Sequence, residues 1–181
     1  MKHFYHTIQG WFDFPVLYSE MVSKYDNAKF IEAGVWKGKS ISYLAVEIIN
    51  AKKNITIDAI DNFPINLPGD ETAYQEFLNN IEPVKDKITL IKKDSVEAAK
   101  DYEDESVDFI FFDSEHSQEH ATQEIKAWYP KIKKGGFLGG HDYVNLYPNK
   151  KGVGFAVTNI FRHRIKLYPG KQCPDITEEI V

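Results

Sequence analysis

The sequence predicts an α/β fold built on a doubly wound, mostly parallel β-sheet with helices on both faces. Short apolar runs alternate with amphipathic stretches along the chain, as in a parallel sheet whose strands are connected by helices. The run 107–113 is largely apolar on both faces, which is typical of a strand in the middle of a covered sheet. Polar residues recur where the apolar runs end, and that edge is where such sheets bind ligands.

Each element follows from local pattern. Strands are predicted over 29–33, 55–61, 88–91, 107–113 and 137–140, the last after a turn at Lys134–Gly136. Helices are predicted over 41–50, 71–81, a short stretch after Ser95, 117–128 and 153–161. Ser40 and Ser117 are expected to cap two of these helices.

The carboxyl end is the least regular part of the pattern. A short strand is predicted over 164–168, and the segment 174–181 is polar and acidic with few apolar residues. We therefore expect the final strand to be irregular or missing. Without a regular final strand, the sheet has an unpaired edge that can pair with a second copy of the chain, which indicates a homodimer.

Length and composition exclude several classes of protein. With 181 residues the chain fits one domain: an aromatic N-terminal segment 1–28, a core 29–143, and a C-terminal helix and edge strand 144–181. The net charge of −5 excludes a general polyanion binder, so nucleic acid is not the expected partner. No apolar run is long enough for a membrane span, and the lone Cys173 excludes a disulfide framework, so we expect a cytoplasmic protein.

The loop Glu32–Ser40 and the acid after the second strand together predict a nucleoside site. The loop has Gly34 and Gly38 but Trp36 where a dinucleotide fingerprint would have a further glycine, so it would hold a pyrophosphate poorly. Asp61 follows Gly38 by 23 positions, near the offset at which an acid binds ribose hydroxyls. This favours an adenosine ligand without phosphates. The alternative is a simple tight turn and a solvated strand end.

These segments resemble class I S-adenosylmethionine-dependent methyltransferases, in particular small O-methyltransferases of the macrocin and sugar-modifying type. The loop EAGVWKGKS resembles their first motif, "E-x-G-V-W-x-G-x-S". The segment 106–117 is similar to "S-x-D-F-x-F-x-D-x-x-H-S", and 128–143 is similar to "W-x-P-x-L-K-x-G-G…G-G-H-D-Y". The resemblance extends from about residue 30 to residue 143.

The resemblance implies a Rossmann-like fold and S-adenosylmethionine as the cofactor. The resemblance implies that Glu32, Gly34 and Ser40 lie around the methionine part of the cofactor. It implies that Asp61 holds the ribose and that Asp94 and Ser95 lie at the adenine edge. The cofactor-binding residues are then Glu32, Gly34, Gly38, Ser40, Asp61, Asp94 and Ser95.

The reaction end of the sheet is predicted from the next two strands. Asp113 ends the fourth strand, and His141 and Asp142 end the fifth, so these residues are expected to meet. Carboxylates at one point suit Mg²⁺, and related O-methyltransferases place acidic ligands there. His141 departs from this pattern, because it stands where some metal-dependent relatives have a second acid and imidazole fits Mg²⁺ less well.

Methyl transfer to a hydroxyl needs a base that takes the proton of the acceptor. His116 is the first candidate, because an imidazole pKa lies near neutrality and because it matches the family histidine, and Glu115 is the second. The alternative of equal weight is a His116 bonded to backbone at the start of a helix. A zinc pair of His116 and His120 has no third ligand to support it.

The sequence thus favours an enzyme that methylates a hydroxyl of a sugar or small secondary metabolite. The rivals are a nucleotide-linked oxidoreductase and a non-catalytic relative that serves as an interaction module. The loop 62–70 is expected to lie beside the ribose end as a lid, and the loop 143–152 is expected to contact the acceptor. The aromatic segment 3–24 is expected to form a helix packed on the sheet edge, and part of it to roof the site.

Overall fold

The computed structural model describes residues 1–64, 70–143, 152–161, 166–168 and 175–179. The strands are β1 (Ala28–Ala33), β2 (Ile55–Ile60), β3 (Ile88–Ile91), β4 (Val107–Phe112), β5 (Ile132–Gly140), β6 (Lys166–Tyr168) and β7 (Asp175–Glu179). The α-helices are α1 (Pro15–Lys24), α2 (Lys39–Ala51), α3 (Ala73–Ile81), α4 (Ser95–Ala98), α5 (Gln118–Trp128) and α6 (Val153–Phe161).

The strands form one mixed sheet in the order β3-β2-β1-β4-β5-β7-β6. The first five strands in this order pair in parallel, and β7 pairs antiparallel with both β5 and β6. The strand order reverses between β1 and β4, and this is the position at which ligands bind in doubly wound sheets. The predicted fold class, an α/β doubly wound and mostly parallel sheet, is confirmed.

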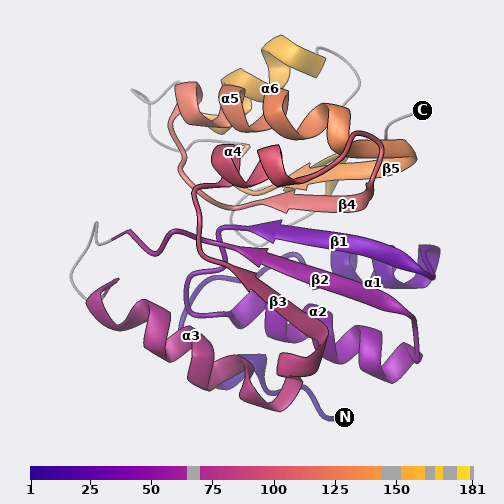
Figure 1. The fold of residues 1–181 in the computed structure, drawn as a ribbon, viewed down its shortest axis with the longest axis vertical. Helices are drawn as coiled ribbons and strands as arrows, with labels where there is room; N and C mark the ends of the chain where they lie inside the picture. The colour runs from indigo at the N-terminus through magenta and orange to yellow at the C-terminus, as the bar shows by residue number, and fades with distance from the viewer. Residues whose placement is uncertain (65–69, 144–151, 162–165, 169–174, 180–181) are drawn as a thin grey trace.

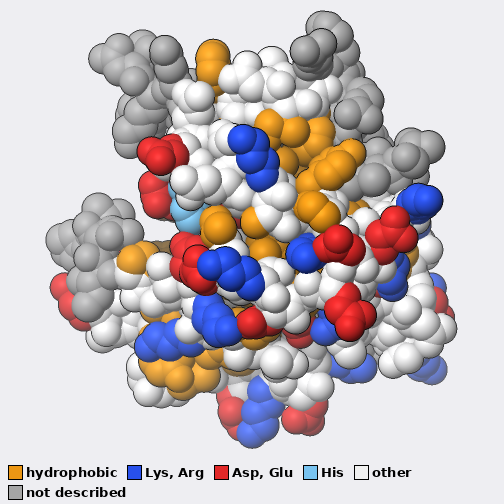
Figure 2. Space-filling view, turned by 45° about the horizontal axis from the view of Figure 1, so that its top comes forward, with side chains coloured by type: hydrophobic (Ala, Val, Ile, Leu, Met, Phe, Trp, Pro, Cys, Tyr) orange, Lys and Arg blue, Asp and Glu red, His pale blue; other side chains and the backbone are white. Residues whose placement is uncertain are grey.

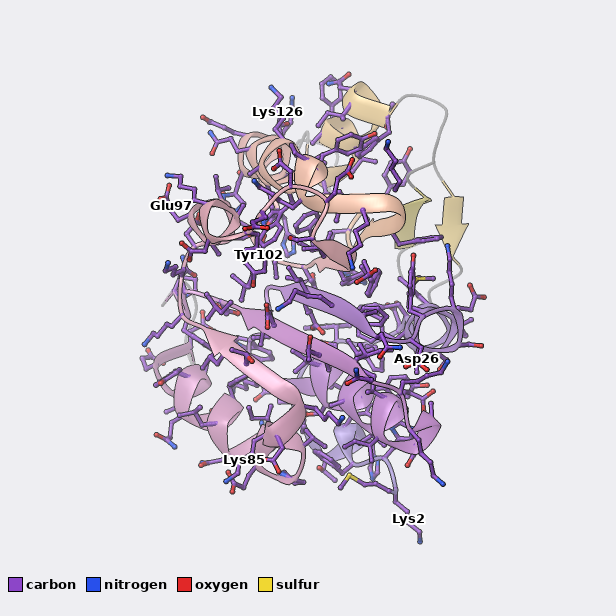
Figure 3. All side chains as sticks on the ribbon, turned by 45° about the vertical axis from the view of Figure 1, so that its right-hand side comes forward. Lys2, Asp26, Lys85, Glu97, Tyr102 and Lys126 are labelled. Atoms are coloured by element: carbon purple, nitrogen blue, oxygen red, sulfur yellow. The ribbon has the colours of Figure 1, made fainter. Side chains whose placement is uncertain are left out.

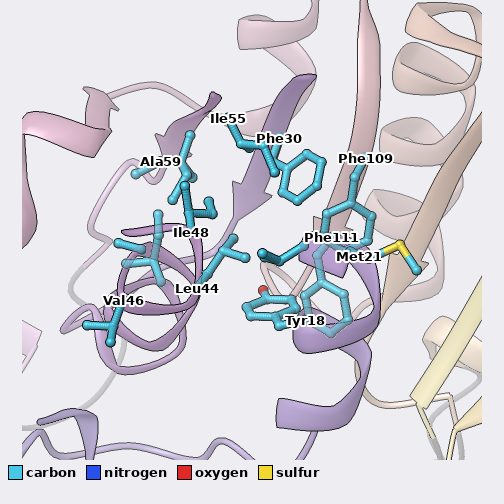
Figure 4. Packing of buried hydrophobic residues seen from close by; sticks show 14 of the residues in the cluster. Tyr18, Met21, Phe30, Leu44, Val46, Ile48, Ile55, Ala59, Phe109 and Phe111 are labelled. Carbon is cyan, nitrogen blue, oxygen red and sulfur yellow. The ribbon is translucent and has the colours of Figure 1, made fainter. Parts of the chain in front are cut away.

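Helices cover both faces of the sheet, with α4, α5 and α6 on one side and α2 and α3 on the other (Figure 1). Each face has its own apolar core. The core under α1 and α2 is rich in aromatic rings from neighbouring strands, among them Phe30, Phe109 and Phe111 (Figure 4). The core under α5 and α6 centres on the fully buried Trp128. No helix in the described part of the chain is long and apolar enough to cross a membrane.

The helix starts show where a local pattern predicts correctly and where it does not. Ser117 caps α5, because its hydroxyl accepts the N–H of His120. The cap predicted for Ser40 is wrong: α2 begins earlier, with Gly38 in the left-handed region at its N-cap. The Ser40 hydroxyl instead donates to the carboxyl group of Glu32, which is fully buried and so requires a hydrogen-bond partner.

Two predictions near the last strands are corrected. The expected turn at Lys134–Gly136 lies inside β5, which begins at Ile132 and shifts its register against β4 between Val107 and Phe109. The positive φ of Gly135, 76°, is absorbed as an irregularity within the strand. The final strand, expected to be irregular or missing, is formed as β7. Backbone pairing with β5 and β6 holds this strand, although its polar sequence does not predict one.

The aromatic N-terminal segment packs differently from the prediction. Its helix, α1, covers the centre of a sheet face and not the sheet edge. The ring centroid of Phe14 lies 4.4 Å from that of Phe111, and the ring centroid of Tyr18 lies 5.4 Å from that of Phe111. Phe111 belongs to β4, the middle strand of the seven. The N-terminal segment is therefore part of the main core.

Candidate active site

The loop after β1 is shaped by close contacts at its glycines. Gly34 has a φ of 89°, and a Cβ placed on it would lie 2.0 Å from the carbonyl oxygen of Asp113. Gly38 has a φ of 84° and lies against Phe77 and Ile81 of α3. Only glycine combines a left-handed backbone with such close approach. The loop after β1 is thus pressed directly onto the end of β4.

Asp61 holds this loop in place. One carboxylate oxygen accepts the backbone N–H groups of Val35 at 2.9 Å and Trp36 at 2.8 Å, and the other accepts the N–H of Phe63 at 2.6 Å. Burial raises the pKa of the Asp61 carboxyl, and these three hydrogen bonds oppose the rise. The predicted ribose contact stays a prediction, but the structure adds a role that the spacing did not reveal: Asp61 fixes the backbone of the loop after β1.

Glu32 is fully buried beneath the same loop. Burial raises the pKa of the Glu32 carboxyl to about 8, while hydrogen bonds from Ser40 and Tyr18 lower it. At neutral pH the side chain is therefore mostly protonated. Removal from water disfavours the carboxylate, so Glu32 contributes a neutral carboxyl group beneath the loop, and its contact with the cofactor stays a prediction.

The predicted adenine end is occupied by local hydrogen bonds. Asp94 caps α4 by accepting the N–H groups of Val96 at 2.9 Å and Glu97 at 3.2 Å. Ser95 is buried, and its hydroxyl accepts the indole N–H of Trp128 at 3.1 Å. These contacts place both residues at the carboxyl side of β3, and contact with adenine stays a prediction.

A buried carboxyl group on α5 connects the segment after β3 to the loop after β4. It is not among the residues predicted from the sequence. Glu124 of α5 accepts the hydroxyl of Ser114 at 2.8 Å and also bonds to Ser95. Burial raises the pKa of the Glu124 carboxyl to about 7, a rise opposed by both serine hydrogen bonds. The only sequence signal for it is a single glutamate on the apolar face of a helix.

The ends of β4 and β5 bring four titratable side chains together. One ligand atom from each of Asp113, His141 and Asp142 lies within 4.8 Å of the others. The Nε2 atom of His116 lies 3.0 Å from the Asp142 carboxylate and 3.5 Å from that of Asp113. In Figure 2 a histidine surface lies among acidic side chains at one edge of the molecule.

The carboxylates control the charge of His116. Hydrogen bonds to Asp113 and Asp142 raise the pKa of the imidazole to about 10, so His116 is an imidazolium at neutral pH. The alternative in which His116 bonds only to backbone is therefore not what the structure shows. Glu115, the second candidate base, is mostly exposed and lies 3.7 Å from His120, outside this cluster.

One further side chain joins the cluster from a distant part of the sequence. The Nε2 atom of His141 lies 3.2 Å from the carboxylate of Asp13, which precedes α1 and is 11% exposed. No motif marks Asp13, because its role depends on a contact across 128 positions.

A hollow opens beside the cluster, between α5, α6 and the ends of β4 and β5. Its empty space, including the open mouth, is about 530 Å³. Polar groups of Asp113, His116 and His141 line one part, whereas Leu138, Val157 and other apolar side chains line most of the rest. Residues 65–69 of the predicted lid and residues 144–151 of the loop predicted to contact the acceptor lie outside the described residues.

Comparison with solved structures shows a shared fold at low sequence identity. CalS11, a TDP-rhamnose 3′-O-methyltransferase of calicheamicin biosynthesis, matches with a TM-score of 0.67 and 18% identity over 91% of this chain and 76% of that chain. A putative rRNA methylase from Clostridium thermocellum gives 0.68 and 14% over 96% and 99%. Fibrillarin from Aeropyrum pernix, with natively bound S-adenosylmethionine, gives 0.58 and 12% over 84% and 66%. A comparison with curated proteins found no match.

A family model described as a methyltransferase domain matches residues 31–143, which include the loop after β1, Asp61 and the cluster at the ends of β4 and β5. This match excludes the nucleotide-linked oxidoreductase considered from the sequence. The chain belongs to this methyltransferase family.

Proposed function

We propose that this enzyme transfers the methyl group of S-adenosylmethionine to a hydroxyl group of a sugar or small secondary metabolite, with a divalent cation held by Asp113, His141 and Asp142. The observation that carries the proposal is the contact between Gly34 and Asp113. It places the cofactor loop directly against the acidic cluster, so a methyl donor on the loop would lie beside groups suited to activate a hydroxyl.

The reaction places few demands on the protein beyond positioning and proton removal. The bond between the methyl carbon and sulfur breaks as a bond from that carbon to the acceptor oxygen forms. Sulfur keeps the electron pair, which gives S-adenosylhomocysteine, and the hydroxyl proton goes to a base. His116, which lies within the cluster, is the proposed base in its neutral form, and Glu115 is the alternative.

The donor set fits a hard or borderline divalent cation. Two carboxylates suit Mg²⁺ or Mn²⁺, and the imidazole of His141 shifts the preference toward Mn²⁺. Such a cation, when bound, lowers the pKa of the acceptor hydroxyl and neutralises the carboxylates that keep His116 protonated.

The hollow beside the cluster supports a small acceptor with an apolar part. Its apolar wall faces the cluster across one continuous space. No lysine or arginine is among the described residues that line it, and the net charge of −5 adds to this mismatch with a polyanion. The O-methyltransferase activity in the name of the similar CalS11 agrees with a hydroxyl acceptor.

The proposal is tested by product formation with defined acceptor panels. Purified protein with S-adenosylmethionine and Mn²⁺ or Mg²⁺ is offered nucleotide sugars, phenols, amines and RNA, and S-adenosylhomocysteine is measured by mass spectrometry. We expect turnover with hydroxyl acceptors only, abolished by EDTA and restored by the cation. Turnover confined to amines or RNA, or unaffected by EDTA, would overturn the acceptor class or the cation respectively. Binding of the cofactor with no turnover on any acceptor would favour the non-catalytic relative.

The base is tested with paired variants on whichever acceptor the panel identifies. His116→Ala should lower turnover by about 10²-fold or more and leave the affinity for S-adenosylhomocysteine unchanged, because the imidazole contacts the carboxylate cluster and not the cofactor loop. Glu115→Ala should leave turnover within about threefold. The opposite pattern would assign the proton transfer to Glu115.

A further inference from the structure

The two ring nitrogens of His141 face different groups. Nε2 lies 3.2 Å from the carboxylate of Asp13. Nδ1 lies 3.1 Å from the carboxylate of Asp142 and 3.8 Å from that of Asp113. The ring therefore stands between a carboxylate on the N-terminal segment and the carboxylates at the ends of β4 and β5.

This arrangement determines what His141 presents to the cluster. An ionised carboxylate only accepts hydrogen bonds, so the contact with Asp13 requires a proton on Nε2. The same rule applied to the 3.1 Å contact of Nδ1 with Asp142 asks for a proton on Nδ1 as well. A cation held by Asp113 and Asp142 would take the place of that proton, and with the remaining proton on Nε2 beside Asp13 the lone pair of Nδ1 would be free to bind it. Nδ1 is the nitrogen that faces Asp113 and Asp142.

We propose that Asp13 is a positioning residue, which fixes His141 with Nε2 protonated and thereby makes Nδ1 a ligand for a divalent cation at Asp113 and Asp142. This inference rests on the proposed cation site. It goes further because it assigns a role to a residue outside the matched family segment 31–143. A carboxylate behind a metal-binding histidine orients the ring and raises its basicity.

The N-terminal segment is anchored well enough to perform this role. Phe14, next to Asp13, is 3% exposed, and its ring centroid lies 5.5 Å from that of His141. At the other side of Asp13, the carbonyl oxygen of Gly10 accepts the side chain of Lys39 at 2.8 Å. The segment thus runs from the cofactor loop to the end of β5, held at both points.

The test measures cation affinity without turnover. Binding of Mn²⁺ alone is followed by electron paramagnetic resonance for the full chain, for Asp13→Ala and for the matched control Asp86→Asn. Asp86 is an exposed aspartate in the short helix Glu82–Lys87. Its neighbour in the sequence, Lys85, is labelled in Figure 3. We expect Asp13→Ala to weaken Mn²⁺ binding by about 10- to 100-fold and Asp86→Asn to leave it unchanged.

A second readout separates orientation of the ring from general damage. Ring ¹⁵N resonances of His141 with Mg²⁺ bound should show the proton on Nε2 in the wild-type chain, and they should show a changed proton distribution in Asp13→Ala. Asp13→Glu, which keeps the carboxylate, should recover most of the Mn²⁺ affinity.

The outcomes are separable. If the wild-type chain binds Mn²⁺ and Asp13→Ala binds it equally well, the role of Asp13 is wrong while the cation site stands. If the wild-type chain binds no Mn²⁺, both the cation site and this role are overturned, while methyl transfer itself is untouched.

Discussion

Gly34 and Asp113 are in contact through their backbones, and this contact joins the loop after β1 to the end of β4. A Cβ on Gly34 would lie 2.0 Å from the carbonyl oxygen of Asp113 and 2.6 Å from the backbone nitrogen of Ser114. The left-handed φ of 89° adds a second reason for glycine. We predict that Gly34→Ala lowers the free energy of unfolding by about 3 kcal/mol or more and weakens S-adenosylhomocysteine binding.

Gly135→Ala is the matched control for this prediction. Gly135 has a φ of 76°, close to that of Gly34, but a Cβ there would meet nothing within 4 Å. It should therefore cost only the backbone strain, about 1–2 kcal/mol, and leave cofactor affinity unchanged. Urea denaturation and calorimetry measure both quantities. Equal losses in the two variants would show that the approach to Asp113 is not what constrains Gly34.

Asp61 should couple cofactor affinity to loop stability. Asp61→Ala leaves the N–H groups of Val35, Trp36 and Phe63 without their acceptor. We expect S-adenosylhomocysteine affinity to fall by about 1.5–3 kcal/mol and the free energy of unfolding to fall by a similar amount, because hydrogen bonds to a charged acceptor are lost.

Asp61→Asn refines this prediction, since an amide keeps one acceptor oxygen but turns an NH₂ group toward backbone donors. Its losses should lie between those of the wild type and Asp61→Ala. Calorimetry that finds unchanged cofactor affinity in Asp61→Ala would show that Asp61 contacts neither the ligand nor the conformation that binds it.

The sheet could be predicted from sequence because its signals are local. Apolar runs such as 55–61 and 107–113 predict their strands without further information. The segment 153–161 is apolar enough to be predicted as a helix. β7 could not be predicted in the same way, since its sequence is polar and its stability comes from pairing with β5 and β6. The register shift in β5 is likewise a property of the pair and not of the glycines alone.

The site residues also separate into those that local pattern and topology predict and those that only tertiary contacts reveal. Asp113, His141 and Asp142 follow strands, so parallel topology alone predicts that they meet, as the structure has them. Asp13 and Glu124 could not be found, because each acts through a contact with a residue that only the tertiary fold brings near. Ser40 was misread as a cap because the burial of Glu32, its actual partner, is not visible in the sequence.

The raised pKa of the Glu32 carboxyl predicts that the free energy of unfolding depends on pH. Burial raises the pKa of its carboxyl from 4.5 to about 8 in the folded chain. The folded state therefore holds a proton that the unfolded state releases between these values. This contribution to stability is complete below pH 4.5, falls as the pH rises, and is lost above about pH 8. The shift corresponds to at most about 5 kcal/mol, because one pKa unit is about 1.4 kcal/mol.

Glu32→Gln should remove this contribution. The variant should be more stable than the wild type at pH 9 and nearly equal to it at pH 4.5, as measured by urea denaturation across the range. Glu97→Gln is the control, because Glu97 lies on the outside of α4 with its side chain 60% exposed (Figure 3). A stability difference for Glu32→Gln that does not change with pH would contradict a buried protonated carboxyl.

Glu124 should be required to hold α5 to the loops after β3 and β4. Its carboxyl group bonds to Ser114 and Ser95, and the Ser95 hydroxyl accepts the indole N–H of Trp128. Glu124→Leu keeps the apolar contacts but leaves the buried serine hydroxyls without this acceptor. We expect the free energy of unfolding to fall by about 2–4 kcal/mol, with a smaller loss for Glu124→Gln, which keeps one acceptor oxygen.

Gln123→Leu provides the comparison for Glu124→Leu, because Gln123 is the adjacent residue of α5 and faces solvent. Its unfolding free energy should stay within about 0.5 kcal/mol of the wild type. If the two leucine variants were equally stable in urea, the hydrogen bonds from Ser95 and Ser114 would contribute nothing net. The position of α5 would then depend on apolar packing around Trp128 alone, and the buried carboxyl group would need an explanation in the chemistry of the adjoining hollow, which it lines.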